Sequence, residues 1–221
     1  MVTAVVGANW GDEGKGKITD MLAEKADIIV RFQGGANAGH TIVNDYGKFA
    51  LHTLPSGVFY GHTTSIIGNG VALNIPVFFK EYNEVVSRGV PAPKILISNR
   101  AQMVMSYHKN FDAYEEERLG GKSFGSTKSG IAPFYSDKYQ KKTIQAGELL
   151  YPEHLKAHLQ DLLEWKNLIL QKVYGAKGYT MEEMTAWLDT YAQQVRPYVT
   201  DTGRYLRQAQ AEGKSILFIT H

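Results

Sequence analysis

The turn after the first apolar segment constrains the fold of this chain more than any other feature of its sequence. Residues 3–6 are mostly apolar, and soon after them comes the run Gly11-Asp12-Glu13-Gly14-Lys15-Gly16-Lys17. This run satisfies the first seven positions of the P-loop pattern, in which backbone N–H groups and a helix N-terminus hold phosphate oxygens. An apolar strand before the turn and a helix at residues 18–25 after it predict a βα unit.

Later segments continue the alternation of strands and helices. Strands are expected at residues 28–32, 49–54, 65–67, 94–98 and 215–219, and a helix at residues 77–87. Over residues 151–211 the apolar period becomes helical, and Thr180 with Glu183 has the spacing of a capping box. We therefore expect an α/β fold with a mostly parallel sheet and a P-loop-like nucleotide site. It forms one domain over residues 1–221, with a helical insertion at about 151–211.

Composition narrows the range of partners. The 24 basic and 22 acidic residues give a net charge of +2, which provides no general attraction to nucleic acid or to a membrane surface. Cysteine is absent, so thiolate chemistry and disulfides are excluded. No apolar run approaches the roughly 20 residues that span a bilayer, and residues 1–6 do not resemble a secretory signal. We expect a cytoplasmic protein without nucleic-acid or membrane partners.

The phosphate loop departs from the usual pattern at one position. Ile18 stands where a Ser or Thr hydroxyl would bind magnesium, so another oxygen must hold the metal. Asp12 lies inside the loop, and a carboxylate beside phosphates is favourable when a cation or a proton lies between them. Lys17 is expected at the β- and γ-phosphates. The alternative is a surface turn with solvated lysines.

A second glycine-rich segment follows the second predicted strand. It reads Gln33-Gly34-Gly35-Ala36-Asn37-Ala38-Gly39-His40-Thr41, and its small residues allow a ligand to approach the backbone closely. His40 is a candidate general acid or charge stabiliser, and the alternative is an exposed loop histidine. We interpret the remaining histidines as ordinary exposed residues: His52, His62, His108, His154, His158 and His221.

These two glycine-rich segments, the first extended to Asn9, resemble the two signature segments of adenylosuccinate synthetase. Further similarity runs through residues 54–57, 66–71, 125–127 and 135–138, and it covers the whole chain but about half of a family member. The resemblance implies a ligase of AMP biosynthesis that phosphorylates IMP on O6 with GTP. L-aspartate then displaces the phosphate to give adenylosuccinate. It also implies a Mg²⁺ cofactor, GTP as co-substrate and a homodimer.

The resemblance also implies roles for individual residues. Asp12 is expected to take the N1 proton of IMP and to bind Mg²⁺ together with the Gly39 carbonyl. His40 is expected to stabilise the transferring phosphoryl group. Residues expected at GTP are Gly11, Asp12, Glu13, Gly14, Lys15, Gly16, Lys17, Gly39, His40 and Thr41. Residues expected at IMP are Asp12, Glu13, Gly14, Lys15, Asn37, Ala38, Gly39, His40, Thr127 and Lys141.

Some positions differ from the family pattern. Lys141 replaces an arginine that reaches the partner's IMP phosphate, and it loses the bidentate fork. Residues 128–133 are altered, and the aspartate-binding and guanine-reading segments are missing, which favours a fragment or a truncated product.

Four alternatives remain. They are a nucleotide-binding switch protein, a P-loop kinase, a viral 2-aminoadenylosuccinate synthetase, and an incomplete fragment that only binds nucleotide. Asp12 argues against the viral branch, which carries a small residue there.

Overall fold

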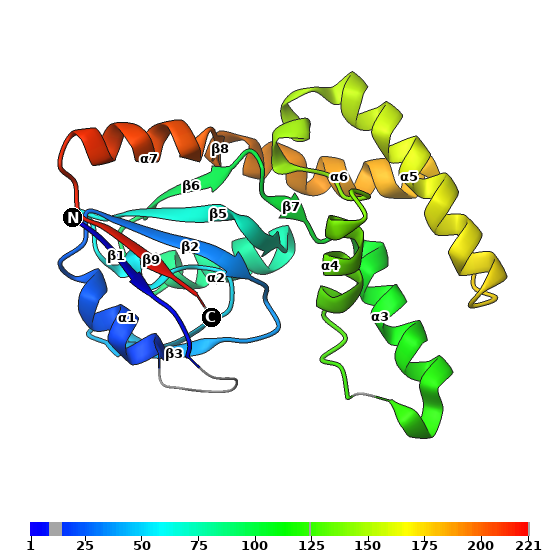
Figure 1. Ribbon diagram of the computed structural model, residues 1–221, viewed down its shortest axis with the longest axis horizontal. Coiled ribbons are helices and arrows are strands. Elements are labelled where there is room, and N and C mark those ends of the chain that lie inside the picture. Colours follow the sequence, from blue (N-terminus) through cyan, green and yellow to red (C-terminus); the bar gives the residue numbers. More distant parts are fainter. Residues whose placement is uncertain (9–14, 124, 221) are drawn as a thin grey trace.

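The computed structural model describes residues 1–8, 15–123 and 125–220. Its main sheet joins parallel strands in the order β1-β9-β2-β5-β6-β8, with β7 paired to one end of β5 (Figure 1). The strands are β1 (Val2–Val5), β2 (Ile28–Gly34), β5 (Thr64–Leu73), β6 (Lys94–Ser98), β7 (Gln102–Met103), β8 (Val199–Thr200) and β9 (Ile216–Ile219). The predicted α/β class with a mostly parallel sheet is confirmed.

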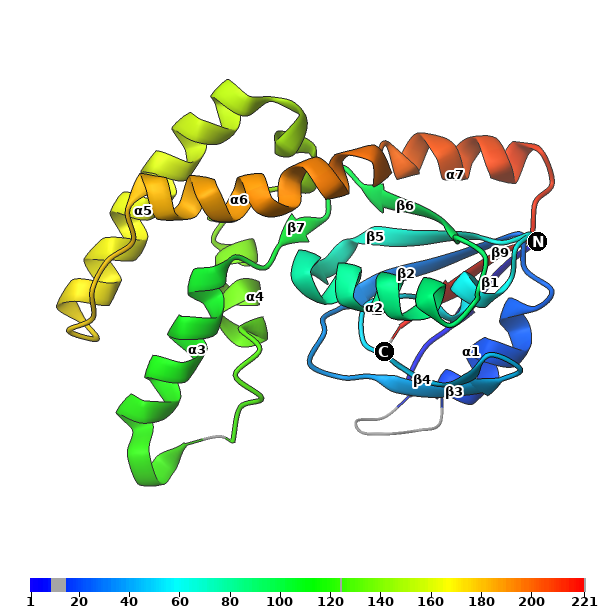
Figure 2. The same cartoon turned by 180° about the vertical axis from the view of Figure 1, so that it is seen from behind.

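Alternating side chains of β2 bind helices to the two faces of the sheet. Ile28 and Val30 pack with Ala209 of α7 (Thr202–Ala211) on one face. Ile29 points to the other face, where it packs with Ala23 of α1 (Lys15–Ala23). Helix α2 (Ile75–Ser87) also covers this second face, as the view from behind makes visible (Figure 2). The period of two along the strand thus produces a three-layer arrangement.

Strand β9 enters the sheet between the first two strands of the chain. Asp27, just before β2, fixes its start: the Asp27 N–H donates to Ser215 Oγ at 2.9 Å, and the Ser215 N–H donates to Asp27 Oδ2 at 2.7 Å. Because β9 pairs with both β1 and β2, it separates the two strands that lead into the glycine-rich segments.

A two-stranded antiparallel hairpin lies outside the main sheet. It consists of β3 (His40–Asn44) and β4 (Gly47–Leu51), and His40 pairs with Leu51. The strand expected at residues 49–54 is therefore shorter and belongs to this hairpin. Ile42 and Phe49 anchor the hairpin because their side chains are buried in the large hydrophobic core.

Helices form the end of the molecule that lies away from β1 and α1 (Figure 1). They are α3 (Ser106–Leu119), α4 (Ile131–Tyr139), α5 (Pro152–Lys172) and α6 (Met181–Val195), with short 3-10 turns η1 (Ser56–Phe59), η2 (Gly120–Lys122), η3 (Ala146–Leu150) and η4 (Arg196–Tyr198). The expected helical stretch thus contains α5, α6 and α7, together with β8 of the main sheet. The capping box is confirmed, since the Glu183 N–H donates to Thr180 Oγ1 at 3.1 Å and the Thr180 N–H donates to Glu183 Oε2 at 2.9 Å. Among the described helices, none has both the length and the apolar content needed to cross a bilayer.

A buried ionic cluster joins three of these helices. Asp137 of α4 lies 3.0 Å from His108 Nε2 of α3 and 2.5 Å from Lys166 Nζ of α5. All three side chains are nearly inaccessible to solvent. His108 is therefore a packed structural residue, contrary to the expectation of an exposed histidine, because the carboxylate satisfies its ring nitrogen inside the core.

Candidate active site

The carboxyl ends of the neighbouring strands β1, β9 and β2 surround the candidate site. Strand β2 leads into the second glycine-rich segment, and β9 leads to Thr220. The Gln33 side chain donates from Nε2 to Thr220 Oγ1 at 2.9 Å, so the ends of these two strands are joined. Open parallel sheets bind ligands at this edge, which makes it the natural place for the residues singled out in the sequence.

The first glycine-rich segment meets the second at the start of α1. Gly11, Asp12, Glu13 and Gly14 lie outside the described residues, whereas Lys15, Gly16 and Lys17 form the first turn of α1. A Cβ atom added to Gly16 would lie 2.9 Å from Cβ of His40. Only glycine fits at this distance, so the two segments touch through Gly16 and His40.

His40 is partly buried at the first position of β3. Burial is the main cause that lowers the pKa of His40 to about 4, and the Arg31 charge and His52 lower it further. At neutral pH the imidazole is therefore uncharged, with one N–H donor and one acceptor nitrogen. Thr41, Asn37, Ala38 and Gly39 beside it are exposed, so a ligand can reach this stretch of backbone.

A buried arginine holds the backbone on both sides of His40. Arg31 is 0% exposed on β2, and its Nη2 donates to the Gly35 carbonyl at 2.8 Å. Its Nη1 donates to the His52 carbonyl, and its Nε donates to the Gln33 carbonyl at 3.4 Å. Burial lowers the pKa of Arg31 to about 10, which leaves the guanidinium charged at neutral pH.

Glu81 of α2 holds the facing segment. Its buried carboxylate accepts N–H donors from His52 at 2.8 Å, from Thr53 at 3.0 Å and from Leu54 at 3.0 Å. The His52 ring in turn lies against Gly39, where an added Cβ would be 2.6 Å from its Nδ1. Arg31 and Glu81 thus both hold the backbone around His40, Arg31 at residues 33, 35 and 52 and Glu81 at residues 52–54.

The sequence analysis did not predict that Arg31 and Glu81 hold the backbone around His40, nor that the His52 ring packs against Gly39. An arginine inside the apolar run of β2 was the available signal, because a charged group is seldom buried without compensation.

Helix α4 connects the second glycine-rich segment to the helical end. The Gly34 N–H donates to the Tyr135 hydroxyl at 3.2 Å, and that hydroxyl donates to the Gly70 carbonyl at 3.2 Å. Gly35 lies against Ile131, whose Cδ1 would be 2.5 Å from an added Cβ. The start of α4 is therefore fixed to the site by close contacts that glycine permits.

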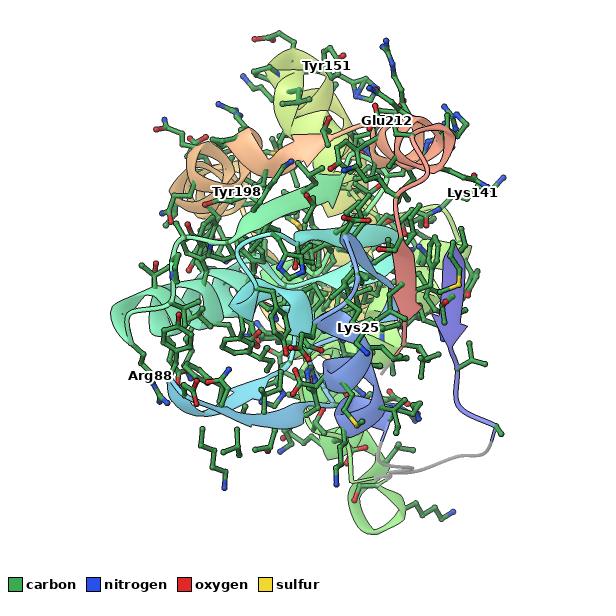
Figure 3. All side chains as sticks on the ribbon, turned by 90° about the vertical axis from the view of Figure 1, so that its left-hand side faces the viewer. Lys25, Arg88, Lys141, Tyr151, Tyr198 and Glu212 are labelled. Carbon is green, nitrogen blue, oxygen red and sulfur yellow. The ribbon has the colours of Figure 1, made fainter. Side chains whose placement is uncertain are left out.

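Thr127 and Lys141 lie at the two ends of α4. The exposed Thr127 hydroxyl contacts the hydroxyl of Ser129, shortly before the helix begins. Lys141, two residues after it ends, has a positive φ of 60° and an exposed side chain that points away from the molecule (Figure 3). Thr127 and Lys141 thus lie at the ends of α4, whereas His40 lies against Gly16 of α1 and pairs with Leu51 of β4.

Carboxylates do not gather at this site in the described part of the chain. Residues 1–8, 15–123 and 125–220 contain no group of three or more His, Asp or Glu side chains that could hold a metal ion. The oxygen groups of this stretch are its backbone carbonyls, including that of Gly39, the amide oxygen of Asn37 and the hydroxyl of Thr41. A hard cation there needs further ligands from phosphate, water or the loop that carries Asp12.

Comparison with known proteins identifies the family. The family model of adenylosuccinate synthetase matches residues 4–220. This chain belongs to the adenylosuccinate synthetase family. It is 47% identical over 216 residues to the adenylosuccinate synthetase of Dehalococcoides mccartyi, a match that covers 98% of this chain and 51% of the relative. It is 46% identical over 214 residues to that of Heliobacterium modesticaldum, covering 97% of this chain and 50% of the relative.

Solved structures agree with this membership. The fully ligated adenylosuccinate synthetase of Plasmodium falciparum superposes with a TM-score of 0.83 at 35% identity, covering 98% of this chain and 50% of that one. The succinoaminodeoxyadenylate synthetase of cyanophage S-2L shares the fold, with a TM-score of 0.60 at 20% identity. The chain spans about half the length of the relatives that it matches.

Proposed function

We propose that this chain is the GTP- and IMP-binding half of a ligase that forms adenylosuccinate from IMP, GTP and L-aspartate. One observation carries the proposal: Gly16 at the start of α1 and His40 touch at the carboxyl ends of the parallel strands. A helix N-terminus for phosphate and a partly buried imidazole are therefore adjacent, as transfer of a phosphoryl group requires.

The proposed reaction has two steps, and Asp12 acts in the first. Its carboxylate takes the N1 proton of IMP, which turns O6 into a nucleophile. O6 attacks the γ-phosphorus of GTP, the bond to the bridging oxygen breaks, and guanosine diphosphate leaves. The amine of aspartate then attacks C6, phosphate leaves with the O6 oxygen, and the amine loses a proton. Asp12 lies outside the described residues, so its role rests on the resemblance.

His40 is proposed to stabilise the transferring phosphoryl group. With a pKa of about 4 it is a neutral N–H donor before substrates bind. An approaching anionic phosphoryl group favours the protonated ring and raises this pKa, so the hydrogen bond strengthens as negative charge develops. His40 therefore acts more strongly in the transition state than in the ground state.

The remaining proposed residues bind and orient the substrates. Lys15, Gly16 and Lys17 hold GTP phosphates, and Thr41 of β3 and Gly39, just before β3, approach them. Asp12 and the Gly39 carbonyl would hold Mg²⁺, which supplies charge neutralisation for the phosphates.

At IMP, Asn37, Ala38 and Thr127 are proposed contacts. Lys141 is proposed to reach the IMP phosphate of a second copy. Its exposed side chain beyond the end of α4 supports a homodimer.

A second candidate function follows from the length of the chain. Because it spans about half of its relatives, it can be a nucleotide-binding half that lacks catalysis until the other half is present. We expect this chain alone to bind IMP and a GTP analogue without forming adenylosuccinate. Isothermal titration calorimetry and a product assay on the 221-residue chain test this expectation.

Kinetics test the catalytic assignment in a protein extended by the second half of the Dehalococcoides mccartyi relative. Asp12→Asn and His40→Asn should each lower kcat by roughly 10²–10⁴-fold with an unchanged circular dichroism spectrum. Thr41→Ser is the conservative control and should keep most of the activity. Near-normal kcat in the Asp12 variant would leave only a phosphate-binding role for the loop.

A further inference from the structure

Residues 125–130, which carry Thr127, lie between two packed helices. Helices α3 and α4 are side by side at the helical end of the molecule, and this segment leads into the start of α4 (Figure 1). Thr127 is exposed, whereas Gly130 at the end of the segment is buried. The place of the Thr127 hydroxyl therefore depends on what holds the residues on either side of it.

One carboxylate of α3 binds both sides of Thr127. Asp112 is 6% exposed. Its Oδ1 accepts a hydrogen bond from Ser126 Oγ at 2.5 Å, and its Oδ2 accepts one from the Gly130 N–H at 2.8 Å. Ser126 Oγ in turn accepts the Lys128 N–H at 3.1 Å. Both oxygens of the buried carboxylate are thus compensated, and hydrogen bonds to such an acceptor are among the stronger ones in proteins.

The backbone of this segment needs such support. Gly125, Lys128 and Gly130 have positive φ values of 73°, 53° and 80°. Glycine adopts them freely, but at Lys128 the left-handed conformation is unfavourable and persists where the surroundings hold it. Gly130 also lies directly on α3, because a Cβ added there would be 2.8 Å from the Lys109 nitrogen. The conformation of residues 125–130 therefore depends on contacts with α3.

The same anchor links Thr127 to the second glycine-rich segment. Ile131 follows Gly130 directly and lies against Gly35, where an added Cβ would be 2.5 Å from Ile131 Cδ1. Thr127 precedes Ile131 by four positions, so the two residues are at most about 14 Å apart. By holding Gly130, Asp112 also limits how far the Thr127 hydroxyl lies from the glycine-rich segment.

We propose that Asp112 is a positioning residue for IMP: it holds the Thr127 hydroxyl where the substrate meets it, without touching the substrate itself. The inference rests on the proposed function, which assigns Thr127 to IMP. Both Asp112 oxygens accept bonds from the protein, so the effect of this residue passes through the segment. Without Asp112, residues 125–130 populate other conformations, and the affinity for IMP falls with the population of the competent one.

Isothermal titration calorimetry with IMP tests the inference in the protein extended by the second half of the Dehalococcoides mccartyi relative. Asp112→Ala removes two hydrogen bonds and should weaken IMP binding roughly 10–100-fold. Asp112→Asn should keep most of the affinity, because its amide can accept from Gly130 and donate to the Ser126 hydroxyl. Glu117→Ala removes an exposed carboxylate of the same helix and is the matched control, with an expected change under about twofold.

Two further measurements separate positioning from a general loss of structure. Binding of a GTP analogue should stay within about twofold in Asp112→Ala, because its phosphates are proposed to lie at α1. Thr127→Ala removes the hydroxyl that Asp112 positions, so adding Asp112→Ala in that background should weaken IMP binding less than about threefold. If Asp112→Ala does not fold, Ser126→Ala decides the case: it removes one of the two bonds, and IMP binding should weaken roughly 3–10-fold.

Each outcome supports or overturns the inference. Unchanged IMP affinity in Asp112→Ala, or in Ser126→Ala where that variant is used, overturns it and leaves the proposed function intact. An equal loss with and without the Thr127 hydroxyl also overturns it, because Asp112 then acts through the fold alone. Failure of the unsubstituted extended protein to bind IMP overturns the proposed function and this inference together.

Discussion

Replacement of Glu81 by Gln should lower the free energy of unfolding far more than replacement of an exposed carboxylate on the same helix. The carboxylate is 4% exposed and accepts N–H donors from residues 52–54 at 2.8–3.1 Å. A neutral amide loses the charge of each of these bonds, at about 1 kcal/mol per bond, and turns an NH₂ group toward other donors. It also removes the negative charge that faces buried Arg31. We expect a loss of about 3 kcal/mol, the lower end of values for breaking a buried charge pair.

Urea unfolding followed by circular dichroism measures this loss. With a slope of about 2–3 kcal/mol/M, the midpoint should fall by roughly 1–1.5 M. Glu84→Gln is the matched control, one turn further along α2, where the carboxylate is 38% exposed and pairs with Arg88. Exposed pairs contribute less than about 1 kcal/mol, so its midpoint should hardly move. If Glu81→Gln costs no more than Glu84→Gln, the carboxylate does not hold residues 52–54, and our account of how His40 is positioned fails.

Three further changes have distinct expected results. The pKa of His40 falls from 6.5 to about 4 on folding, so between these pH values the unfolded state binds more protons than the folded state. The free energy of unfolding should therefore drop as pH falls through this range. In urea titrations, His40→Asn should flatten the part of this slope above about pH 5. Gly16→Ala should cost about 1–3 kcal/mol by thermal unfolding, since its Cβ would lie 2.9 Å from His40, whereas Gly61→Ala, with nothing within 4 Å, should be neutral. Lys166→Met breaks the buried pair with Asp137 and should cost about 3–5 kcal/mol by urea unfolding. Lys172→Met, at an exposed position of the same helix, should cost under about 0.5 kcal/mol. Similar costs for the two variants would contradict a stabilising role of the buried His108–Asp137–Lys166 cluster.

The α/β class was predictable because apolar runs and glycine-rich turns alternate along the first part of the chain. The strand expected at residues 94–98 has those bounds in the structure, and the one expected at 28–32 is longer by two residues. Helix α1 begins at Lys15, three residues earlier than expected, because the lysines and glycine of the loop complete its first turn. Strand β3 was missed because it follows directly on glycines and small residues that show no alternation.

Strand order was beyond the reach of local patterns. Neither β1 nor β9 carries a signal that they are neighbours, since parallel pairing is set by packing between distant segments. The contact of Gly16 with His40 also needs the tertiary structure, although both residues were singled out. The roles of Asp12, Thr127 and Lys141 stay predictions, and Asp12 lies outside the described residues.

The place of β9 between β1 and β2 determines when the site can form during translation. Asp27 and Ser215, which close this part of the sheet, are 188 residues apart in the chain. At about 5–20 residues per second, a ribosome needs roughly 10–40 seconds to make the intervening chain. During that interval both glycine-rich segments have emerged without the strand that separates and supports them. Nucleotide is then expected to bind only after β9 has left the ribosome. A chain stalled before β9 would leave the facing edges of β1 and β2 unpaired and prone to aggregation.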